Sequence, residues 1–535
     1  MSKKQNLVSA RIKRTGETVM KKTTRIVLAL VAAVTLFGCK GQVSEKSVEN
    51  DFEFTNLERK QELAQLALLG DYKVSEETAA DSLLSFLISK DSENGRAASI
   101  SDYRLEKIDT ATIDCSGITK SINRSSSIEE YEDVDFYLYQ INNSVTDKSG
   151  YAVLSNDRRI GEVISVLDDS EFSEDISDNT FMQIVCVGLQ NYVGDTAEVW
   201  NSLTEDDLNI AAERSSKTPE DTVKEGGWTY SRWNRNPEKG NTKYILKTKW
   251  DQNDSPYNNC IVDVLGGDAY YAGCGAVAVA QIMAFHEWPK NCTSANYSRI
   301  KNGWYRARNW NGVYNWKLLK SVESPSSYFT NPSELQIQIG ALLFDVAEGC
   351  KSSYDEDGTS TISADRLSFL NSIGYTYDSE TDYSYDAIKT SINNGRPVML
   401  RGYSIKNTKT ETVDIPHRFL WWKWTTQETR TTTSYEGGHC FIVDGYFNMS
   451  CTATKGAESV SISKDFVHCN PGWGGINNGY YISGVFDMRD NHFIADENEI
   501  LDDMNNSRSS KTKSDNLGDN NYGFNIHQVT NIRKK

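Results

Sequence analysis

The sequence predicts an α+β protein made of two successive parts. In the first half, strand-like runs at residues 134–141 and 151–155 flank a turn, and a helical pattern follows at residues 180–203. In the second half, helical patterns come first, and β-rich runs bounded by glycine, asparagine or proline follow them. A charged, irregular stretch over residues 205–242 separates the halves. This order predicts two compact α+β parts joined by a linker.

The chain starts with the features of an export signal. Basic residues precede an apolar run over residues 26–37, and this run is too short to span a bilayer comfortably. It ends in Leu-Phe-Gly-Cys, which resembles the lipobox of bacterial lipoproteins, in which the cysteine is acylated and becomes the mature N-terminus. We therefore expect a signal region over residues 1–39 with Cys39 lipidated; an ordinary buried cysteine is the alternative. The protein would be exported and lipid-anchored to a bacterial membrane, in the periplasm or at the cell surface, and maturation could release it.

Composition narrows the range of partners. The chain has 57 Lys and Arg against 74 Asp and Glu, a formal net charge of −17, which repels nucleic-acid phosphates at long range. No nucleic acid is therefore expected as a partner. After residue 39 no run is long and apolar enough to span a membrane, so we expect membrane contact through the lipid anchor only. The sequence contains no Cys-x-x-Cys pair typical of structural zinc sites, and we expect no metal and no cofactor.

Composition also divides the exported chain. Residues 40–60 are polar and charged, and they predict a flexible tether. The first α+β part then covers residues 61–215, and the second covers residues 243–535. Residues 216–242 form the predicted linker, and because exposed polar segments attract proteolytic nicking, we expect an activation cleavage there. A plain linker without cleavage is the alternative.

Cys274 is the candidate nucleophile. It follows a turn-like Tyr-Ala-Gly and opens a run of small and apolar residues over 275–285, which predicts a buried central helix. A cysteine at the start of a helix, beside a histidine, has the lowered thiol pKa that nucleophilic catalysis needs. A cysteine in such a run is also a common packing residue, so this feature alone does not decide between the two roles.

His439 is the candidate base. Paired glycines precede it, and an apolar strand over residues 440–446 follows, which would hold the imidazole rigidly towards a thiol. A histidine at the edge of a strand can instead be a satisfied polar group. At the end of the next predicted strand, Asn470 is a candidate for orienting the imidazole and Trp473 for shielding it.

The order Cys, His, Asn-x-x-Trp along the chain is typical of papain-like peptidases. Together with its flanking residues, this order resembles the streptopain family of papain-like cysteine peptidases. The blocks that carry the resemblance are residues 250–258, 273–286, 395–398, 437–445 and 470–480.

The resemblance implies a papain-like catalytic domain over residues 243–535, with a helical half that carries the nucleophile helix and an antiparallel β half. It implies Cys274 as nucleophile, His439 as general base and acid, and Gln252 as a donor in the oxyanion hole. It also implies that residues 61–215 are a prosegment that inhibits this domain. The protein would be a cysteine endopeptidase, exported as an inactive precursor. Once the prosegment is removed, it would hydrolyse proteins and peptides through a thiolate acyl-enzyme mechanism.

Two departures from the family keep other functions open. Pro471 stands where the family usually has a tryptophan, and residues 404–435 are an insertion that contains Phe-Leu-Trp-Trp-Lys-Trp. We expect the insertion to form a long hairpin near the cleft, with core packing or a partner-binding surface as alternatives. The alternative function is a catalytically silent papain-like surface protein that binds a partner protein through this insertion. Another acyl transfer reaction on the same dyad is a third alternative.

Overall fold

The computed structural model describes most of the chain after residue 58. The expected signal region, the lipidation of Cys39 and nearly all of the tether lie outside the described residues. Residues 60–535 form one compact unit. Within the described ranges, no helix combines the length and the apolarity needed to cross a membrane. The described residues are 59–70, 72–93, 98–115, 118, 125, 127–167, 170, 172–173, 175–176, 179–214, 216–217, 229–236, 244–253, 255–266, 270–325, 332–355, 358–407, 412–429, 434–487 and 526–535.

A large antiparallel sheet runs through both α+β parts. Its main path, in order across the sheet, is β1 (Tyr103–Ile113), β2 (Val134–Asn143), β3 (Lys148–Ser155), β4 (Val163–Leu167), β17 (Gly479–Ile482), β16 (Glu458–Asn470), β15 (Ser434–Lys455), β12 (Val398–Asn407), β18 (His527–Val529) and β11 (Thr381–Asp382). Three short strands pair beside this path, β5 (Ser216–Lys217) with β16, and β6 (Thr229–Tyr230) and β7 (Asn234–Arg235) with β15.

The two parts meet where β4 pairs with β17. Gly479 of β17 lies opposite Leu167 of β4, and the register continues to Tyr481 opposite Ser165. A Cβ atom at Gly479 would collide with the backbone of Val166 and Leu167. Only glycine allows this close approach, so the first part extends the sheet of the second part by direct strand pairing.

The sheet separates two hydrophobic cores. Side chains alternate between its faces along β15, so that Phe441 and Val443 enter one core while Cys440 and Ile442 enter the other. The first core joins buried side chains of the first part with those of β15 and β16. The second core consists mainly of helical residues of the second part. The strand that carries the candidate base therefore touches both cores.

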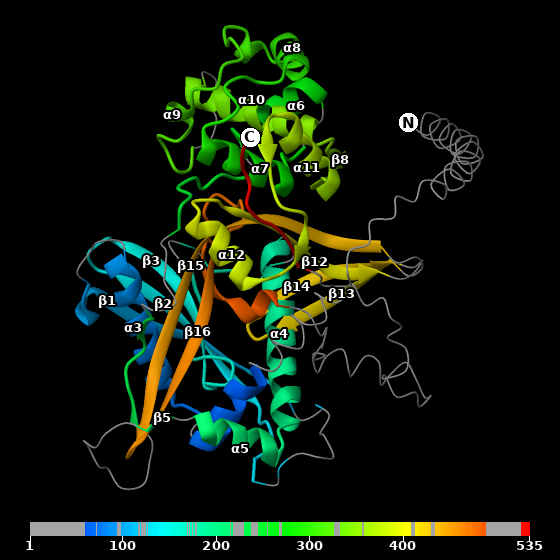
Figure 1. Cartoon of the computed structure of the whole chain (residues 1–535). Coiled ribbons are helices and arrows are strands. Elements are labelled where there is room, and N and C mark those ends of the chain that lie inside the picture. The colour runs from blue at the N-terminus through cyan, green and yellow to red at the C-terminus, as the bar shows by residue number, and fades with distance from the viewer. Residues whose placement is uncertain are drawn as a thin grey trace, which may run out of the picture. The chain divides into compact units, whose positions relative to one another are not determined.

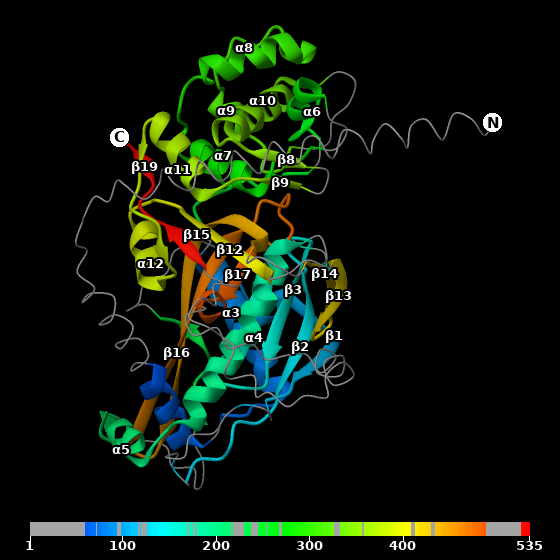
Figure 2. The same ribbon diagram turned by 90° about the vertical axis from the view of Figure 1, so that its right-hand side faces the viewer.

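Helix α4 (Thr180–Asn201) connects the two parts. Asn179 caps its N-terminus by accepting a hydrogen bond from the N–H of Met182 at 3.1 Å, and most of the helix is buried. Although α4 belongs to the first part, it contacts β12 and β15, and it lies along the sheet in both views (Figure 1, Figure 2). The other helices of the first part are α3 (Glu76–Glu93) and α5 (Glu205–Arg214), and residues 59–69 are also helical.

The helices of the second part gather around α7 (Cys274–His286) (Figure 1). Residues 275–284 of α7 are all buried, as expected for a central helix that is apolar on every side. Around it lie α6 (Asn259–Leu265), α8 (Ser294–Gly303), α9 (Trp316–Leu319), α10 (Glu334–Gly349) and α11 (Ser363–Ser372), and α12 (Tyr385–Asn393) lies beside β15.

The 3-10 turns are η1 (Ile100–Asp102), η2 (Tyr305–Ala307) and η3 (Ser483–Phe486). The small two-stranded sheets are β8 (Ser353–Asp355) with β9 (Gly358–Ser360), β10 (Tyr375–Thr376) with β19 (Arg533–Lys534), and β13 (Thr412–Phe419) with β14 (Trp422–Thr429).

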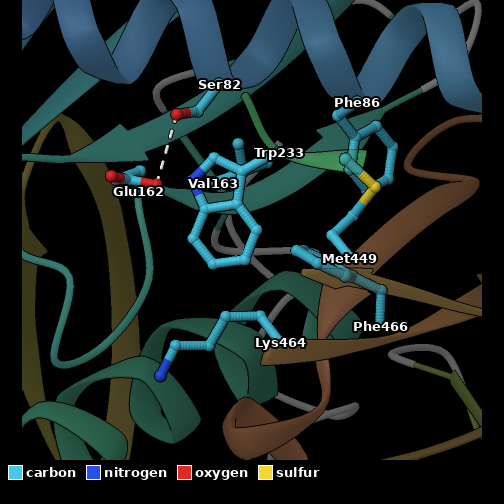
Figure 3. A pocket seen from close by; sticks show the side chains of 8 residues that line it. All are labelled: Ser82, Phe86, Glu162, Val163, Trp233, Met449, Lys464 and Phe466. Carbon is cyan, nitrogen blue, oxygen red and sulfur yellow. Dashed lines mark hydrogen bonds between the residues drawn. The ribbon is translucent and has the colours of Figure 1, made fainter. Parts of the chain in front are cut away.

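The predicted linker is partly docked. The guanidinium of Arg158 lies 3.6 Å from the centre of the Tyr230 ring, and its Nε donates to Glu162 at 2.9 Å. Trp233 enters a small cavity with its ring nitrogen towards Glu162, which also accepts a hydrogen bond from Ser82 at 3.2 Å (Figure 3). Together with the pairing of β6 and β7 on β15, these contacts attach the described linker residues to both parts.

The predicted α+β class is confirmed, together with the elements that carry the candidate site. The helix expected after Cys274 is α7, the pattern at residues 180–203 is α4, and the strand at 440–446 lies within β15. The prediction that residues 205–242 are irregular is wrong at its start, where α5 forms. Its first turn is acidic, which suits the positive end of a helix dipole, and its apolar side chains Leu208 and Ala211 are buried.

Candidate active site

Cys274 is the first residue of α7. Gly273 before it has a φ of +86°, a conformation that residues with side chains rarely adopt. A Cβ atom at Gly273 would also lie 2.9 Å from the backbone oxygen of Thr359. Glycine is therefore needed at this turn, which brings the chain into the helix with Cys274 at its positive end. The Cys274 side chain is only partly buried.

The surroundings of Cys274 stabilise a thiolate. The N–H of Cys440 donates a hydrogen bond to Sγ of Cys274 at 3.4 Å. Burial acts against the thiolate, but the charge and hydrogen bond of His439, this N–H and the guanidinium of Arg366 together lower the pKa of Cys274 to about 7. Burial instead raises the pKa of the Cys440 thiol to about 11. Cys274 is therefore the more acidic of these two neighbouring thiols.

His439 lies on β15 opposite Gly402 of β12 and is buried. Its Nε2 lies 2.8 Å from the carbonyl oxygen of Pro471. Because a carbonyl oxygen only accepts, Nε2 carries the proton and donates it to Pro471. In the neutral ring, Nδ1 is then the basic nitrogen that can take up a proton.

A residue of the first part contacts this basic nitrogen. Oγ1 of Thr180, the first residue of α4, lies 3.2 Å from Nδ1 of His439, and with Nδ1 as the acceptor the hydroxyl is the donor. Phe181 packs its ring against His439 at a centroid distance of 6.0 Å and against Phe441 at 4.9 Å. The N-terminal end of α4 therefore covers the imidazole.

Gln252 is tied to the loop that leads to Cys274. Its backbone oxygen accepts a hydrogen bond from the N–H of Ala272 at 2.8 Å, and the residue is 8% exposed. No described residue forms a hydrogen bond with its side-chain amide. The amide is therefore available as a donor, which its candidate role in the oxyanion hole requires.

Asn470 is fixed beside the Pro471 turn rather than on the imidazole. Its Nδ2 donates to the carbonyl of Thr248 at 2.7 Å and to Oε1 of Gln281 at 3.1 Å, and its Oδ1 accepts from the N–H of Gly472 at 3.2 Å. The group bonded to the imidazole is the Pro471 carbonyl. Asn470 can therefore act on the imidazole only by positioning this turn.

Trp473 lies over the imidazole of His439. The two ring centroids are 6.0 Å apart and the ring planes differ by 19°, so the rings are stacked. The indole is partly buried. The shielding role of Trp473 stays a prediction.

Three groups at the site were not predicted. They are the Thr180 hydroxyl, the Pro471 carbonyl and the buried guanidinium of Arg366. An Asn-Thr pair at the start of a helical pattern indicates a cap, which Asn179 provides, but it does not indicate a contact with a distant histidine. Pro471 stood out only as a departure from the family pattern.

Comparison with known proteins finds one family model that matches the residues around the site. Residues 250–481 match the model of the Peptidase C10 family. No curated protein matches the chain. Among solved structures, the chain is similar to a fragment of *Prevotella intermedia* prointerpain A that carries a point mutation, at 15% identity and a TM-score of 0.42, over 81% of this chain and 99% of that chain. It is also similar to active wild-type interpain A cysteine protease of the same organism, at 18% identity and a TM-score of 0.28, over 46% of this chain and 88% of that chain.

Proposed function

We propose that the chain, whose residues 250–481 match the model of the Peptidase C10 family, is a cysteine-type endopeptidase exported as an inactive precursor. Removal of the prosegment, residues 61–215, would activate it on protein and peptide substrates. The observation that carries this proposal is the pair of Cys274 and His439, with a prosegment hydroxyl bonded to the basic nitrogen of the pair.

The geometry supports an acyl-enzyme mechanism. Nδ1 of His439 would take the proton of the Cys274 thiol, and the thiolate would attack the peptide carbonyl. The backbone N–H of Cys274 and the amide of Gln252 would stabilise the charge on the carbonyl oxygen. His439 would then give its Nδ1 proton to the leaving amine, which leaves a thioester on Cys274. Water, deprotonated by His439, would hydrolyse the thioester and restore the thiolate. Pro471 and Trp473 would keep the imidazole in position throughout.

Inhibition by the prosegment would act on His439. The Thr180 hydroxyl donates to the nitrogen that must exchange protons with the thiol and with the leaving amine. Phe181 adds an apolar ring beside the imidazole, where a substrate would otherwise lie. The precursor would therefore hold an assembled dyad whose base is blocked.

Cleavage of the linker alone would not release the prosegment. A cut within residues 216–242 breaks the covalent link, but the pairing of β4 with β17 and the burial of Trp233 do not depend on it. Because such contacts persist until the prosegment unfolds or dissociates, activation would need a second step after the cut. Further cleavage of the prosegment would supply that step.

The location of the protein is part of the proposal. The signal region, the lipid on Cys39 and the tether at residues 40–60 would hold the peptidase on an exported face of a bacterial membrane. Its substrates would then be proteins and peptides outside the cytoplasm. A precursor form would protect the exporting cell from proteolysis during synthesis.

The departure at Pro471 does not favour the catalytically silent alternative. A proline has a backbone carbonyl like any other residue, and this carbonyl accepts the Nε2 hydrogen bond of His439. The imidazole therefore has an orienting partner without the tryptophan that the family usually has there.

The test compares the full chain with its Cys274→Ala variant on unfolded casein under reducing conditions. Fragments of casein and shortening of the chain itself are followed together. We expect only the parent to cut casein, after a cut within residues 216–242. If neither chain cuts casein, even after an added protease has nicked the linker and degraded the prosegment, the peptidase proposal is wrong and the silent binding protein replaces it.

A further inference from the structure

The hairpin of β13 and β14 covers part of the first α+β part with one apolar face. Its strands pair so that Phe419 lies opposite Trp422. Trp422 and Trp424 are buried, whereas Lys423 and Thr425 are exposed on the other face. The insertion at residues 404–435 thus contains the expected hairpin, and Trp422 and Trp424 belong to the hydrophobic core that also contains the buried prosegment residues.

A non-helical stretch of the prosegment lies on this face. Phe172 packs against Trp422 with ring centroids 6.3 Å apart. The N–H of Ile176 donates to the carbonyl of Lys423 at 2.7 Å, and Asp175 forms a parallel β-bridge with Lys423. A backbone contact combined with an aromatic side chain is how an extended peptide adds to the edge of a sheet.

The loop that follows Pro471 forms a second wall. Ile476 and Asn477 of this loop line a pocket of about 50 Å³ together with Phe172, Ile176 and Trp422. Two elements of the catalytic part therefore flank the same prosegment stretch. We call them the binding strip, defined as Trp422, the main chain of Lys423, Ile476 and Asn477.

The binding strip leads to the catalytic histidine. Four residues after Ile176, the prosegment reaches Thr180, which bonds to His439. Figure 2 shows the hairpin beside the end of α4 that lies away from α5, and Thr180 is the first residue of α4. When the prosegment leaves, the strip would open as a continuation of the cleft on the side of His439.

We propose that the binding strip holds the part of an unfolded polypeptide substrate that follows the cleaved bond, and that it favours a bulky apolar or aromatic side chain there. This inference rests on the peptidase function proposed above. Because His439 protonates the leaving amine, the chain after the cleaved bond departs on the histidine side. A side chain of the substrate would take the place of Phe172 against Trp422.

The chain direction of the prosegment determines whether a substrate would pair with β14 in the parallel or the antiparallel sense. The prosegment runs from Phe172 towards His439, whereas the leaving part of a substrate runs away from it. The prosegment bridge to Lys423 is parallel, so a substrate would pair with β14 in the antiparallel sense. Thr180 is eight residues after Phe172. This stretch contains a turn, because the N–H of Asn179 donates to the carbonyl of Ile176 at 2.9 Å. An extended substrate covers the same span with no more residues, so the favoured side chain would lie within about eight residues after the cleaved bond.

The test uses the full chain after maturation, by itself or by an added protease, and two kinds of substrate. One is a short fluorogenic peptide that ends at the cleaved bond. The other is an unfolded peptide with about ten residues beyond that bond, including one phenylalanine in the favoured window. We expect Trp422→Ala to lower kcat/KM for the long peptide roughly ten- to thirtyfold, as truncation of an aromatic anchor does. The kcat/KM for the short peptide, which does not reach Trp422, should stay the same.

Three controls sharpen the test. Trp422→Phe keeps an aromatic ring and should retain most of the activity on the long peptide. Thr425→Ala, on the exposed face of β14, should leave kcat/KM the same for both peptides. A peptide with the sequence of residues 170–178 should inhibit cleavage of the long peptide but not of the short one.

Each other outcome contradicts the inference. Equal loss on both substrates in Trp422→Ala would mean that the tryptophan only supports the fold. An unchanged kcat/KM of Trp422→Ala for the long peptide would mean that substrates do not bind to the binding strip. If the parent cleaves neither peptide while the strip competitor still binds to it, the proposed peptidase function is wrong, and the inferred role in substrate cleavage is wrong with it.

Discussion

The hydroxyl of Thr180 lies 3.2 Å from Nδ1 of His439. The other ring nitrogen donates to the Pro471 carbonyl, so Nδ1 is the nitrogen that must exchange protons during catalysis. The Thr180 hydroxyl, which belongs to the first part of the chain, therefore contacts the ring nitrogen of His439 that would take up and give away protons. This relationship would explain how the proposed precursor contains an acidic Cys274 thiol and is still inactive.

Replacing Thr180 should weaken inhibition. Thr180→Ala removes the hydrogen bond but keeps the helix cap, which Asn179 provides. A hydrogen bond of about 1 kcal/mol corresponds to a change of roughly fivefold, so hydrolysis of a short peptide by the uncut precursor should rise by about this factor. The measurement is the initial rate before any shortening of the chain.

Thr180→Ser serves as the matched control, because it keeps the hydroxyl. Its rate should equal that of the parent precursor. If Thr180→Ala is as inactive as the parent, the hydroxyl does not hold the base and coverage by Phe181 accounts for inhibition.

Alkylation of Cys274 should follow an unusually low pKa. With the pKa lowered to about 7, the thiolate fraction and the rate of reaction with iodoacetamide should rise through pH 7 and level off above pH 8. A thiol of ordinary pKa would still gain reactivity between pH 8 and 9. Rates are followed by peptide mass mapping of the native precursor.

Cys440 provides an internal comparison in the same experiment. It is buried and its pKa is raised to about 11, so it should stay unmodified at neutral pH. Labelling of Cys274 that rises only above pH 8 would contradict the account of its electrostatics.

Removal of the Gln252 amide should slow turnover. Loss of one donor from an oxyanion hole typically costs about 100-fold or more in kcat, so Gln252→Ala should show a loss of this size with little change in KM. Circular dichroism and the alkylation rate of Cys274 check that the fold and the thiol are intact. A loss below about fivefold would exclude Gln252 as a main oxyanion donor.

Asn470 should act as a positioning residue. Asn470→Ala leaves Gln281 and the Thr248 carbonyl without this partner, and unpaired buried groups cost about 1–3 kcal/mol in the free energy of unfolding. It also releases the Gly472 N–H, so the Pro471 carbonyl should be less well held. We therefore expect kcat to fall and the pH profile of kcat/KM to shift.

The pH profile separates positioning from simple stability. If Asn470→Ala lowers the free energy of unfolding but leaves kcat and the pH profile unchanged, the residue supports the fold alone. Urea unfolding and the pH profile of peptide hydrolysis give the two readouts.

The elements that carry Cys274 and His439 could be predicted because their signals are local. The small apolar run after Cys274 encodes a buried helix, and paired glycines followed by an apolar strand encode the setting of His439. The same holds for α4 and for β2 and β3 of the first part. Each of these patterns lies within about twenty residues.

The partners of His439 could not be predicted, because they are not local patterns. Thr180 and His439 are 259 positions apart, and only the packing of α4 against the sheet brings them together. The Pro471 partner is a backbone carbonyl, whose position depends on the turn and not on the side chain. Asn470 was expected on the imidazole, but Thr248, Gln281 and Gly472 engage its amide.

Charge composition was misleading just before the predicted linker. Acidic residues at 205–207 indicated an irregular stretch, yet they form the first turn of α5. Burial of Leu208 and Ala211 against the first part stabilises this short helix, and that packing is not visible in the composition.

The most direct test of the whole account is the reaction of the precursor and the matured chain with a peptide that carries an epoxide, which alkylates a thiolate in the cleft. Intact mass and peptide mapping are measured for both forms. The account predicts one adduct on Cys274 of the matured chain and none on the precursor, because Thr180 and Phe181 cover His439 there. Equal labelling of both forms, or an adduct on another cysteine, would contradict it.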